Sequence, residues 1–118
     1  MLERRKIHRR YLAIYSRVFD LASGRVLGYL ADLSLKGTMI ISDDPLPQNK
    51  IYTLRFALPD YPGFSADHLD LHARVAWCHA DVDPTFQDIG FEFSEIFAQD
   101  IRIIEEMIES YDFRLSIR

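Results

Sequence analysis

Two short stretches of the sequence carry side chains suited to holding an anionic ligand. The first is the basic leader, Glu3 to Arg10, in which five of eight residues are permanent cations: Arg4, Arg5, Lys6, Arg9 and Arg10. Clustered cations attract anions. The leader is therefore a candidate half of an anion site, although a solvated tail, a localisation signal or a nucleic-acid arm would carry the same charge.

The second stretch, Ala31 to Ile40, has the pattern Asp32-x-Ser34-x-x-Gly37 between two apolar runs. Short polar side chains followed by glycine are typical of a turn, because Asp and Ser bond to nearby backbone N–H groups and Gly tolerates a positive φ. The spacing alone fits a turn and also fits a ligand-binding loop.

A metal site is not expected, although four potential ligands lie in one region: His68, His72, Cys78 and His79. On an extended strand His72 and Cys78 would be about 20 Å apart, and His68 and His72 about 13 Å apart. Zinc ligands must all lie within about 2.0–2.3 Å of one ion. Cys78 and His79 are neighbours, but adjacent strand residues point to opposite faces.

We also expect no enzyme. The sequence has no nucleophile-elbow, phosphate-loop or metalloprotease motif. Because Cys78 and His79 diverge on a strand, they make a poor nucleophile and base. Three carboxylates are expected in a solvated loop: Asp81, Asp83 and Asp88.

The composition indicates one globular domain of 118 residues with formal net charge -4. A single cysteine allows no internal disulfide, which fits a reducing cytoplasm. No stretch approaches the roughly 20 apolar residues of a membrane helix, so no membrane insertion is expected. The negative net charge, and the clustering of five of the fourteen Lys and Arg residues in the leader, argue against a nucleic-acid polymer as ligand.

The elements that must position these residues are mostly strands. Alternating apolar residues predict strands over 52–58, 69–78 and 89–93, and β-branched and aromatic residues favour further strands over 11–19, 25–30 and 38–42. Ala22-Ser23-Gly24 predicts a hairpin turn. The tail changes to a helical period, with one apolar face: Phe97, Ile101, Ile104, Ile108 and Tyr111. Its helix would cover one opening of a barrel or meet a partner.

The combination resembles the PilZ domain, the bacterial receptor module for cyclic di-GMP. The resemblance is carried by Arg5-x-x-x-Arg9 before the first strand, Asp32-x-Ser34-x-x-Gly37 after the first hairpin, Val75-x-Trp77, Gly90-Phe91-x-Phe93 and a terminal helix. It covers essentially the whole chain. It implies a mainly β fold, a six-stranded antiparallel barrel of split-barrel type with a C-terminal helix. Residues 1–10 would be a flexible leader and residues 11–118 the barrel with its helix.

The resemblance also implies a binding role for each motif residue. Arg5 and Arg9 would grip phosphates or guanine O6/N7, because the guanidinium fork makes paired bonds. Asp32 would accept from guanine N1–H and N2–H, Ser34 would add a hydroxyl, and Gly37 would let the backbone approach. Arg4 implies two intercalated ligands per chain.

Four further residues are weaker candidates for ligand contact. His8 and Arg10 flank the arginine pair, and Lys36 sits within the second motif. Trp77 has two open interpretations: it stacks on a guanine, or it belongs to the core, since its parity matches Leu71 and Val75.

The expected function is a cytoplasmic cyclic di-GMP receptor with no other cofactor. Its leader would order on binding and present a new surface to an unidentified effector protein, in motility, exopolysaccharide synthesis and biofilm formation, virulence or transcription. The alternatives are a PilZ-like adaptor of pilus or motility systems that binds no ligand, and a small barrel that binds single-stranded nucleic acid. A structural interaction module using the terminal helix stays open as an added role.

Overall fold

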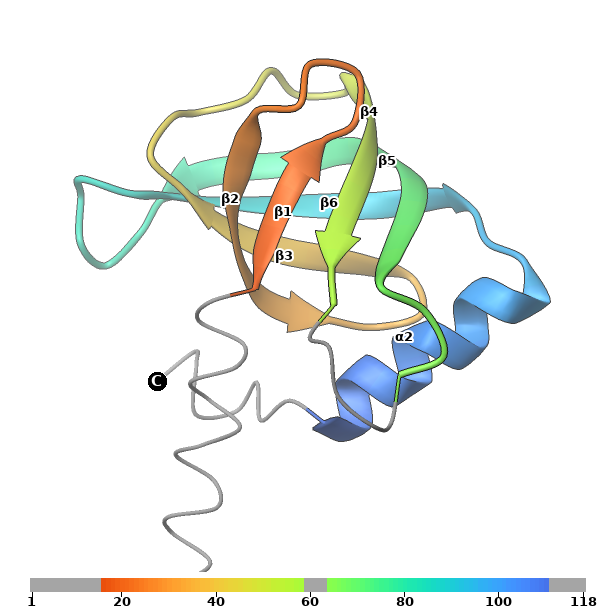
Figure 1. Ribbon diagram of the computed structural model, residues 1–118. Helices are drawn as coiled ribbons and strands as arrows, with labels where there is room; N and C mark the ends of the chain where they lie inside the picture. Colours follow the sequence, from red (N-terminus) through yellow and green to blue (C-terminus); the bar gives the residue numbers. More distant parts are fainter. Residues whose placement is uncertain (1–15, 59–63, 111–118) are drawn as a thin grey trace, which may run out of the picture.

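Six antiparallel strands close into a barrel, followed by a helix that packs beside one end of it (Figure 1). In chain order these are β1 (Arg17–Asp20), β2 (Val26–Leu33), β3 (Gly37–Ser42), β4 (Ile51–Ala57), β5 (His68–Ala80), β6 (Gln87–Glu95) and α2 (Ala98–Ser110). The computed structural model describes residues 16–58 and 64–110. The mainly β fold expected from the sequence, a six-stranded antiparallel barrel with a C-terminal helix, is confirmed.

The order of strands around the barrel differs from their order in the chain. It runs β1-β2-β3-β6-β5-β4, and β4 pairs with β1 to close the circle. The hairpin β5–β6 is therefore inserted between β3 and β4. As a result β2, β3, β6 and β5 are consecutive neighbours, which brings the stretch around residue 32 near the stretch around residue 77.

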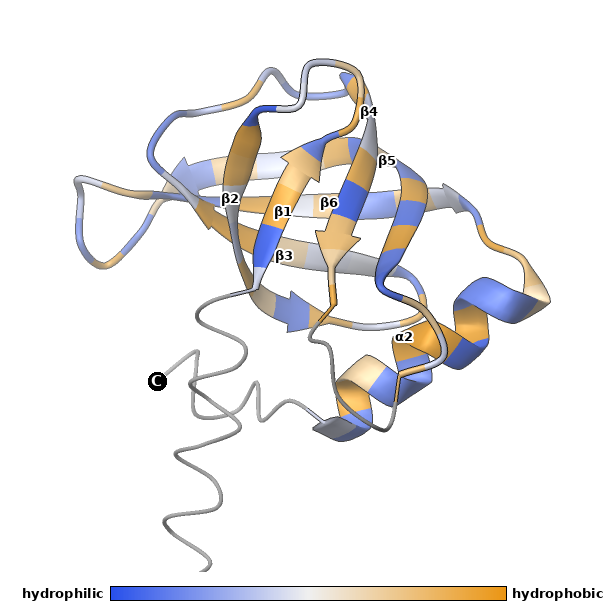
Figure 2. Ribbon diagram, viewed as in Figure 1, coloured by the Kyte–Doolittle hydropathy of each residue, from blue (hydrophilic) through white to orange (hydrophobic). Residues whose placement is uncertain are grey.

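The barrel is filled by alternate side chains of its strands, as the period of two predicts. In β4 the inward residues Tyr52, Leu54 and Phe56 are buried, and the residues between them are at least partly exposed. The same alternation is visible as orange and blue bands along the strands (Figure 2). The ring of Tyr52 meets that of Phe91 edge to face at 6.2 Å across the interior.

The strand register shifts at four places in the described barrel, and two of these β-bulges change which residues face outward near residues 32 and 77. In β2, Leu30 pairs with Ile40 and Asp32 with Met39, so Ala31 is an extra residue. In β5, Val75 pairs with Phe91 and Trp77 with Gly90, so Ala76 is extra. An extra residue reverses which face the following side chains point to. Asp32 and Trp77, which share the parity of buried residues, are thereby turned outward.

Helix α2 lies near the end of β4 and the start of β5 (Figure 1). Ile104 and Met107 are fully buried in the core cluster. The apolar face expected from the sequence is partly wrong, because Phe97 is 58% exposed and Ile108 38% exposed. The helix is rotated so that Met107 and the partly buried Ile103 face the barrel; Tyr111 lies outside the described residues.

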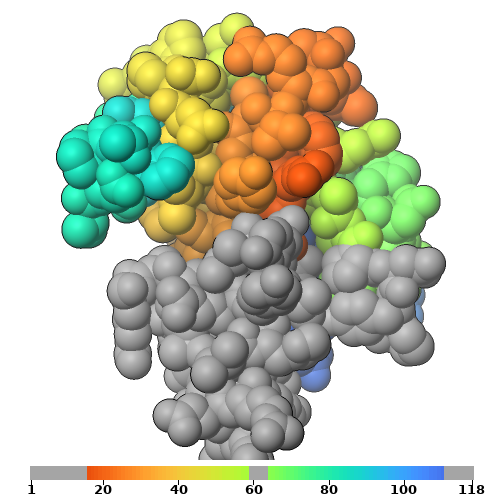
Figure 3. Space-filling model, turned by 60° about the vertical axis from the view of Figure 1, so that its left-hand side comes forward, coloured from red at the N-terminus to blue at the C-terminus, as the bar shows by residue number. Residues whose placement is uncertain are grey.

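Several expected boundaries also shift. The first hairpin is confirmed: β1 ends at Asp20, β2 begins at Val26, and Gly24 has φ 76° in the turn between them. Within the described residues the first strand begins only at Arg17, and 11–15 lie outside them. Strand β2 continues past residue 30 to Leu33 and so contains Asp32. The loop joining β5 to β6 projects from the barrel, in teal in Figure 3.

Candidate functional site

The strand register lines up four residues across the outer surface of the barrel. Asp32 of β2 pairs with Met39 of β3, Met39 with Gly90 of β6, and Gly90 with Trp77 of β5. Neighbouring strands are about 4.8 Å apart, so this row spans roughly 14 Å from the β2 backbone to the β5 backbone. An acid and an aromatic ring thus stand at the two ends of a row that has a methionine and a glycine between them.

Both ends of the row face outward because of the two bulges. Asp32 is exposed, although Leu30 and Leu33 on either side of it are buried. Trp77 is 38% exposed, whereas Val75 is fully buried. The interpretation of Trp77 as a core residue, which rested on parity, is therefore wrong, and the extra residue Ala76 is the physical reason.

The turn from Ser34 to Gly37 connects β2 to β3 beside this row. Ser34 Oγ accepts from the N–H groups of Lys36 at 3.2 Å and Gly37 at 3.3 Å, and Ser34 N–H donates to Gly37 O at 2.9 Å. Asp32 Oδ1 accepts from Leu33 N–H at 2.9 Å, and Thr38 Oγ1 donates to Asp32 O at 2.7 Å. Asp32 and Ser34 thus stabilise a turn, as their spacing predicts, and this turn holds Asp32 at one end of the row.

Gly37 has a structural role that does not depend on a ligand. It pairs with Glu92 in the β3–β6 ladder, and a Cβ added to it would collide with the backbone O of Phe91. Its φ is not positive. The glycine is therefore required by the close approach of β3 to β6.

Gly90 is a part of the site that sequence reasoning did not assign to it. A Cβ at Gly90 would collide with the indole ring of Trp77, at Cε2, Nε1 and Cζ2. The bare backbone of β6 thus makes room for the indole between β5 and β3. From the sequence, Gly90 and Phe91 served only as part of the family pattern. The signal for the role of Gly90 is its position opposite Trp77 when residues are paired outward from the β5–β6 turn.

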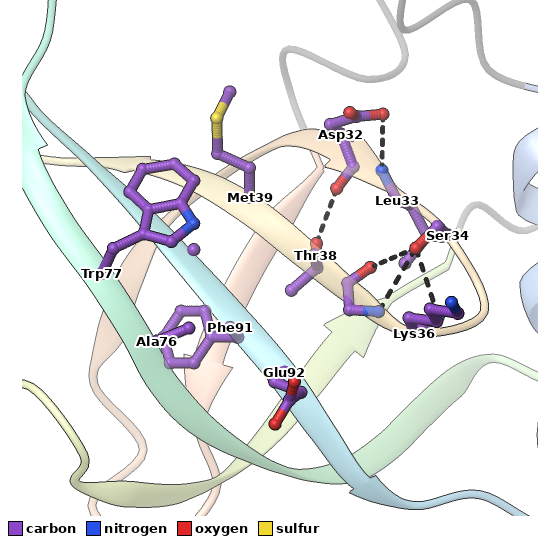
Figure 4. A pocket seen from close by; sticks show the side chains of 12 residues that line it. Asp32, Leu33, Ser34, Lys36, Thr38, Met39, Ala76, Trp77, Phe91 and Glu92 are labelled. Atoms are coloured by element: carbon purple, nitrogen blue, oxygen red, sulfur yellow. Dashed lines mark hydrogen bonds between the residues drawn. The ribbon is translucent and has the colours of Figure 1, made fainter.

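These residues surround a pocket of about 320 Å³ (Figure 4). Its lining comes from four strands and one turn: Asp32, Leu33, Ser34, Lys36, Gly37, Thr38, Met39, Ala76, Trp77, Gly90, Phe91 and Glu92. The charged members are Asp32, Glu92 and Lys36. Arg74 NH2 contacts Glu92 Oε1 at 3.0 Å and anchors that side chain. The described lining therefore brings no net positive charge to a ligand.

The indole of Trp77 is stacked on the imidazole of His79, with ring centroids 4.7 Å apart and planes 10° from parallel.

Asp88 of β6 pairs with His79 across the β5–β6 ladder. The expectation that Asp88 lies in a loop is wrong, because β6 begins at Gln87. Burial, and next the neighbouring carboxyl of Asp81, raise the pKa of Asp88 above the ordinary aspartate value. Asp88 Oδ1 is buried without a hydrogen-bond partner among the described residues.

The histidines and the cysteine considered as metal ligands lie apart and have other neighbours. His72 Nδ1 contacts Thr53 Oγ1 at 3.0 Å, His68 Nδ1 contacts Asp67 Oδ1 at 2.6 Å, and Cys78 Sγ contacts Gln87 Oε1 at 3.7 Å. In residues 16–58 and 64–110, no three His, Cys, Asp or Glu side chains gather as a metal site would require.

The described residues bring together five of the ten predicted site residues: Asp32, Ser34, Lys36, Gly37 and Trp77. The other five belong to the leader and lie outside the described residues: Arg4, Arg5, His8, Arg9 and Arg10. No helix in the described part of the chain is long and apolar enough to cross a membrane.

Comparison with known proteins places the fold among characterised ones. The model of a family described as PilZ domain matches residues 3–110. The inhibitor of motility MotI/DgrA from Bacillus subtilis has a TM-score of 0.62 at 18% identity, over 80% of this chain and 44% of that one. The chain thus spans less than half of that structure. The PilZ domain of YcgR from Escherichia coli, solved with c-di-GMP, has a TM-score of 0.62 at 15% identity, over 86% of this chain and 85% of that one. The search of curated proteins gives no match.

Proposed function

The chain belongs to the PilZ domain family, and we propose that it is a receptor for cyclic di-GMP that binds over the pocket between Asp32 and Trp77. The observation that supports this most is the row Asp32–Met39–Gly90–Trp77, which offers a base-edge acceptor at one end and a stacking surface at the other. A related PilZ domain, that of YcgR, was solved with this ligand.

The two ends of the row suit the two ways of recognising a guanine, which are hydrogen bonds to its edge and stacking on its ring. Asp32 Oδ1 already accepts from Leu33 N–H, and a carboxylate has further lone pairs for guanine N1–H and N2–H. The indole of Trp77 is exposed enough to stack on a purine ring, which stabilises a base by about 1–3 kcal/mol. We propose that Ser34 acts through the turn it holds and that Lys36 supports a phosphate.

The two phosphates need more positive charge than the described lining of the pocket supplies. Lys36 is its one cation, beside the carboxylates of Asp32 and Glu92, and Glu92 is paired with Arg74. We propose that Arg5 and Arg9 of the leader supply this charge, with Arg4, His8 and Arg10 assisting. Residues 1–10 would then act as a leader that orders when the ligand binds, over the barrel of 11–118.

The output of such a receptor is a changed surface. A leader closed over the ligand would form a composite patch of arginines, nucleotide and barrel, which an effector protein could recognise. We propose a cytoplasmic receptor of this kind with no enzymatic step of its own. Because MotI is a motility inhibitor by its name, motility is one output that the fold family accommodates.

Titration calorimetry with cyclic di-GMP tests the proposal. We expect saturable binding to the wild type, and a loss of at least about tenfold in affinity for Asp32→Ala and Arg5→Ala, since each removes a charge-assisted bond. Matched controls are Asp43→Ala and Arg25→Ala, which change the same charges at exposed positions away from the pocket.

The same titration measures the number of ligands bound per chain and can contradict the proposal. Arg4 predicts two ligands per chain, and saturation near one would contradict that. Equal affinity in all five proteins would mean that the ligand binds elsewhere. No heat and no binding to the wild type would overturn the proposed function itself.

A further inference from the structure

The face-to-face contact of Trp77 with His79 is a structural feature of the site that ligand contacts do not explain. The two residues are separated by one position on β5 and point to the same side of the strand. Their rings are 10° from parallel with centroids 4.7 Å apart. One face of the indole is therefore already covered in the absence of any ligand.

The imidazole is held in one orientation by its own backbone. His79 Nδ1 lies 3.2 Å from the carbonyl O of Ala80. Because a carbonyl oxygen only accepts, Nδ1 carries the hydrogen of this bond. The bond fixes the plane in which the imidazole meets the indole.

The ionisable groups near His79 come from β6 and the hairpin loop. Asp88 is its cross-strand partner on β6, and the carboxyl of Asp81 lies close to that of Asp88. On the opposite edge of β5, the segment before β4 contacts the strand earlier, at Val75 and Ala76, through Asn49 and Gln48. The ring of His79 therefore has two carboxylates of the β5–β6 hairpin near it.

His79 contacts the indole of Trp77 but is not part of the pocket lining. Trp77 lines the pocket together with Ala76 and Glu92. We infer that His79 is a positioning residue of the ligand site: it stacks on the indole face turned away from the pocket and leaves the other face for a purine. This inference rests on the proposed function.

The physical basis is a column of three flat rings. An indole fixed by one stacking partner loses less rotamer freedom when a base stacks on its other face, so the base binds more tightly. A flat ring at position 79 should therefore be enough to keep the binding strong, and the loss of that ring should weaken it.

The ligand-free protein gives the first test, since Trp77 is the only tryptophan of the chain. A ring stacked on the indole limits its motion and its contact with water. We therefore expect His79→Ala to show lower emission anisotropy and an emission maximum at longer wavelength than the wild type, and His79→Phe, which keeps a ring at this position, to stay close to the wild type. Emission of His79→Ala equal to that of the wild type, or an equal change in His79→Phe, would overturn the inference.

Affinity for cyclic di-GMP gives the second test. We expect His79→Ala to bind about tenfold more weakly than the wild type, and His79→Phe, which keeps a flat ring against the indole, to bind within about threefold of the wild type. Binding by His79→Ala equal to that of the wild type would overturn the inference and leave the proposed function intact. No binding by the wild type would overturn the proposed function, while the fluorescence would still decide whether the stack exists.

Discussion

The two glycines of this site are required because a group of a neighbouring strand occupies the space where a side chain would lie. Gly90 has no side chain because the indole of Trp77 occupies that space, and Gly37 has none because the backbone of Phe91 does. The two glycines differ in one respect. The group above Gly90 is the end of a side chain, which can move, and the group next to Gly37 is backbone, which cannot move without disturbing the β3–β6 ladder.

Substitution of Gly90 by alanine should therefore displace the indole and leave the barrel folded. We expect a changed tryptophan emission maximum and a loss of about tenfold in affinity for cyclic di-GMP, because the stacking surface is moved. Emission spectra and calorimetry measure the two effects. Gly24→Ala is the control: its φ of 76° makes alanine strained in that turn, but its Cβ would meet nothing within 4 Å, so the emission of Trp77 should not change. An unchanged spectrum in Gly90→Ala would contradict the placement of Trp77.

Substitution of Gly37 by alanine should instead destabilise the protein by about 1–3 kcal/mol, which is typical of overpacking against a rigid neighbour. Urea denaturation measures the change in the free energy of unfolding. Ser34→Ala, in the same turn, should cost about 1 kcal/mol through its lost hydrogen bonds. Normal stability with lost binding would mean that the glycine serves the ligand and not the ladder.

At the scale of elements, two bulges decide which strand residues face the ligand. A period of two predicts the buried residues of β4 and the first half of β5 from the sequence, because each apolar side chain there faces the interior. It fails at Ala31 and Ala76, because an extra alanine leaves no mark in the local pattern. The sequence therefore allowed Asp32, Ser34 and Gly37 to be recognised as one motif, but the orientation of Trp77 and the role of Gly90 required the cross-strand register.

Helix α2 could likewise be predicted only in part from the sequence. Its existence was predictable from the apolar period, but its rotation depends on the shape of the barrel end. Ile104→Ala should lower the free energy of unfolding by about 2–5 kcal/mol, because Ile104 is fully buried in the core. Ile108→Ala, on the same helix but 38% exposed, should cost less than about 1 kcal/mol. Equal losses in thermal or urea denaturation would contradict the observed rotation.

The β5–β6 hairpin carries a carboxyl whose ionisation is unfavourable. Burial, and then the carboxyl of Asp81, raise the pKa of Asp88, so the folded protein keeps this proton to a higher pH than the unfolded chain. The stability of the wild type should therefore fall as pH rises from about 4, the ordinary aspartate value, through the raised pKa.

Asp88→Asn cannot ionise and should lose this contribution to the pH dependence. Relative to the wild type, the variant should gain stability between about pH 4 and about pH 7. Urea denaturation at these two values measures the difference, with the exposed Asp43→Asn as control. A difference between variant and wild type that does not change with pH would contradict the raised pKa.

At the scale of the whole molecule, the barrel would recognise the guanine and the leader would supply positive charge for the phosphates. The strand order places β2, β3, β6 and β5 side by side, so one outer face collects an acid, a turn and an aromatic ring from distant parts of the chain. Among the described residues that line the pocket on that face, Lys36 is the one cation, against the carboxylates of Asp32 and Glu92. A receptor divided in this way would couple ligand binding to the position of its leader, which is what an adaptor needs in order to signal.

Amide and indole N–H chemical shifts during titration with cyclic di-GMP test the central claim most directly, because they report binding and location together. The account predicts saturable shifts at the Trp77 indole N–H, at Gly90 and along 32–37, with new protection of leader amides, and little change at Arg55 and Asp70, which form an ion pair on β4 and β5 and do not line the pocket. Shifts centred on β4, or no shift at a saturating concentration, would contradict it.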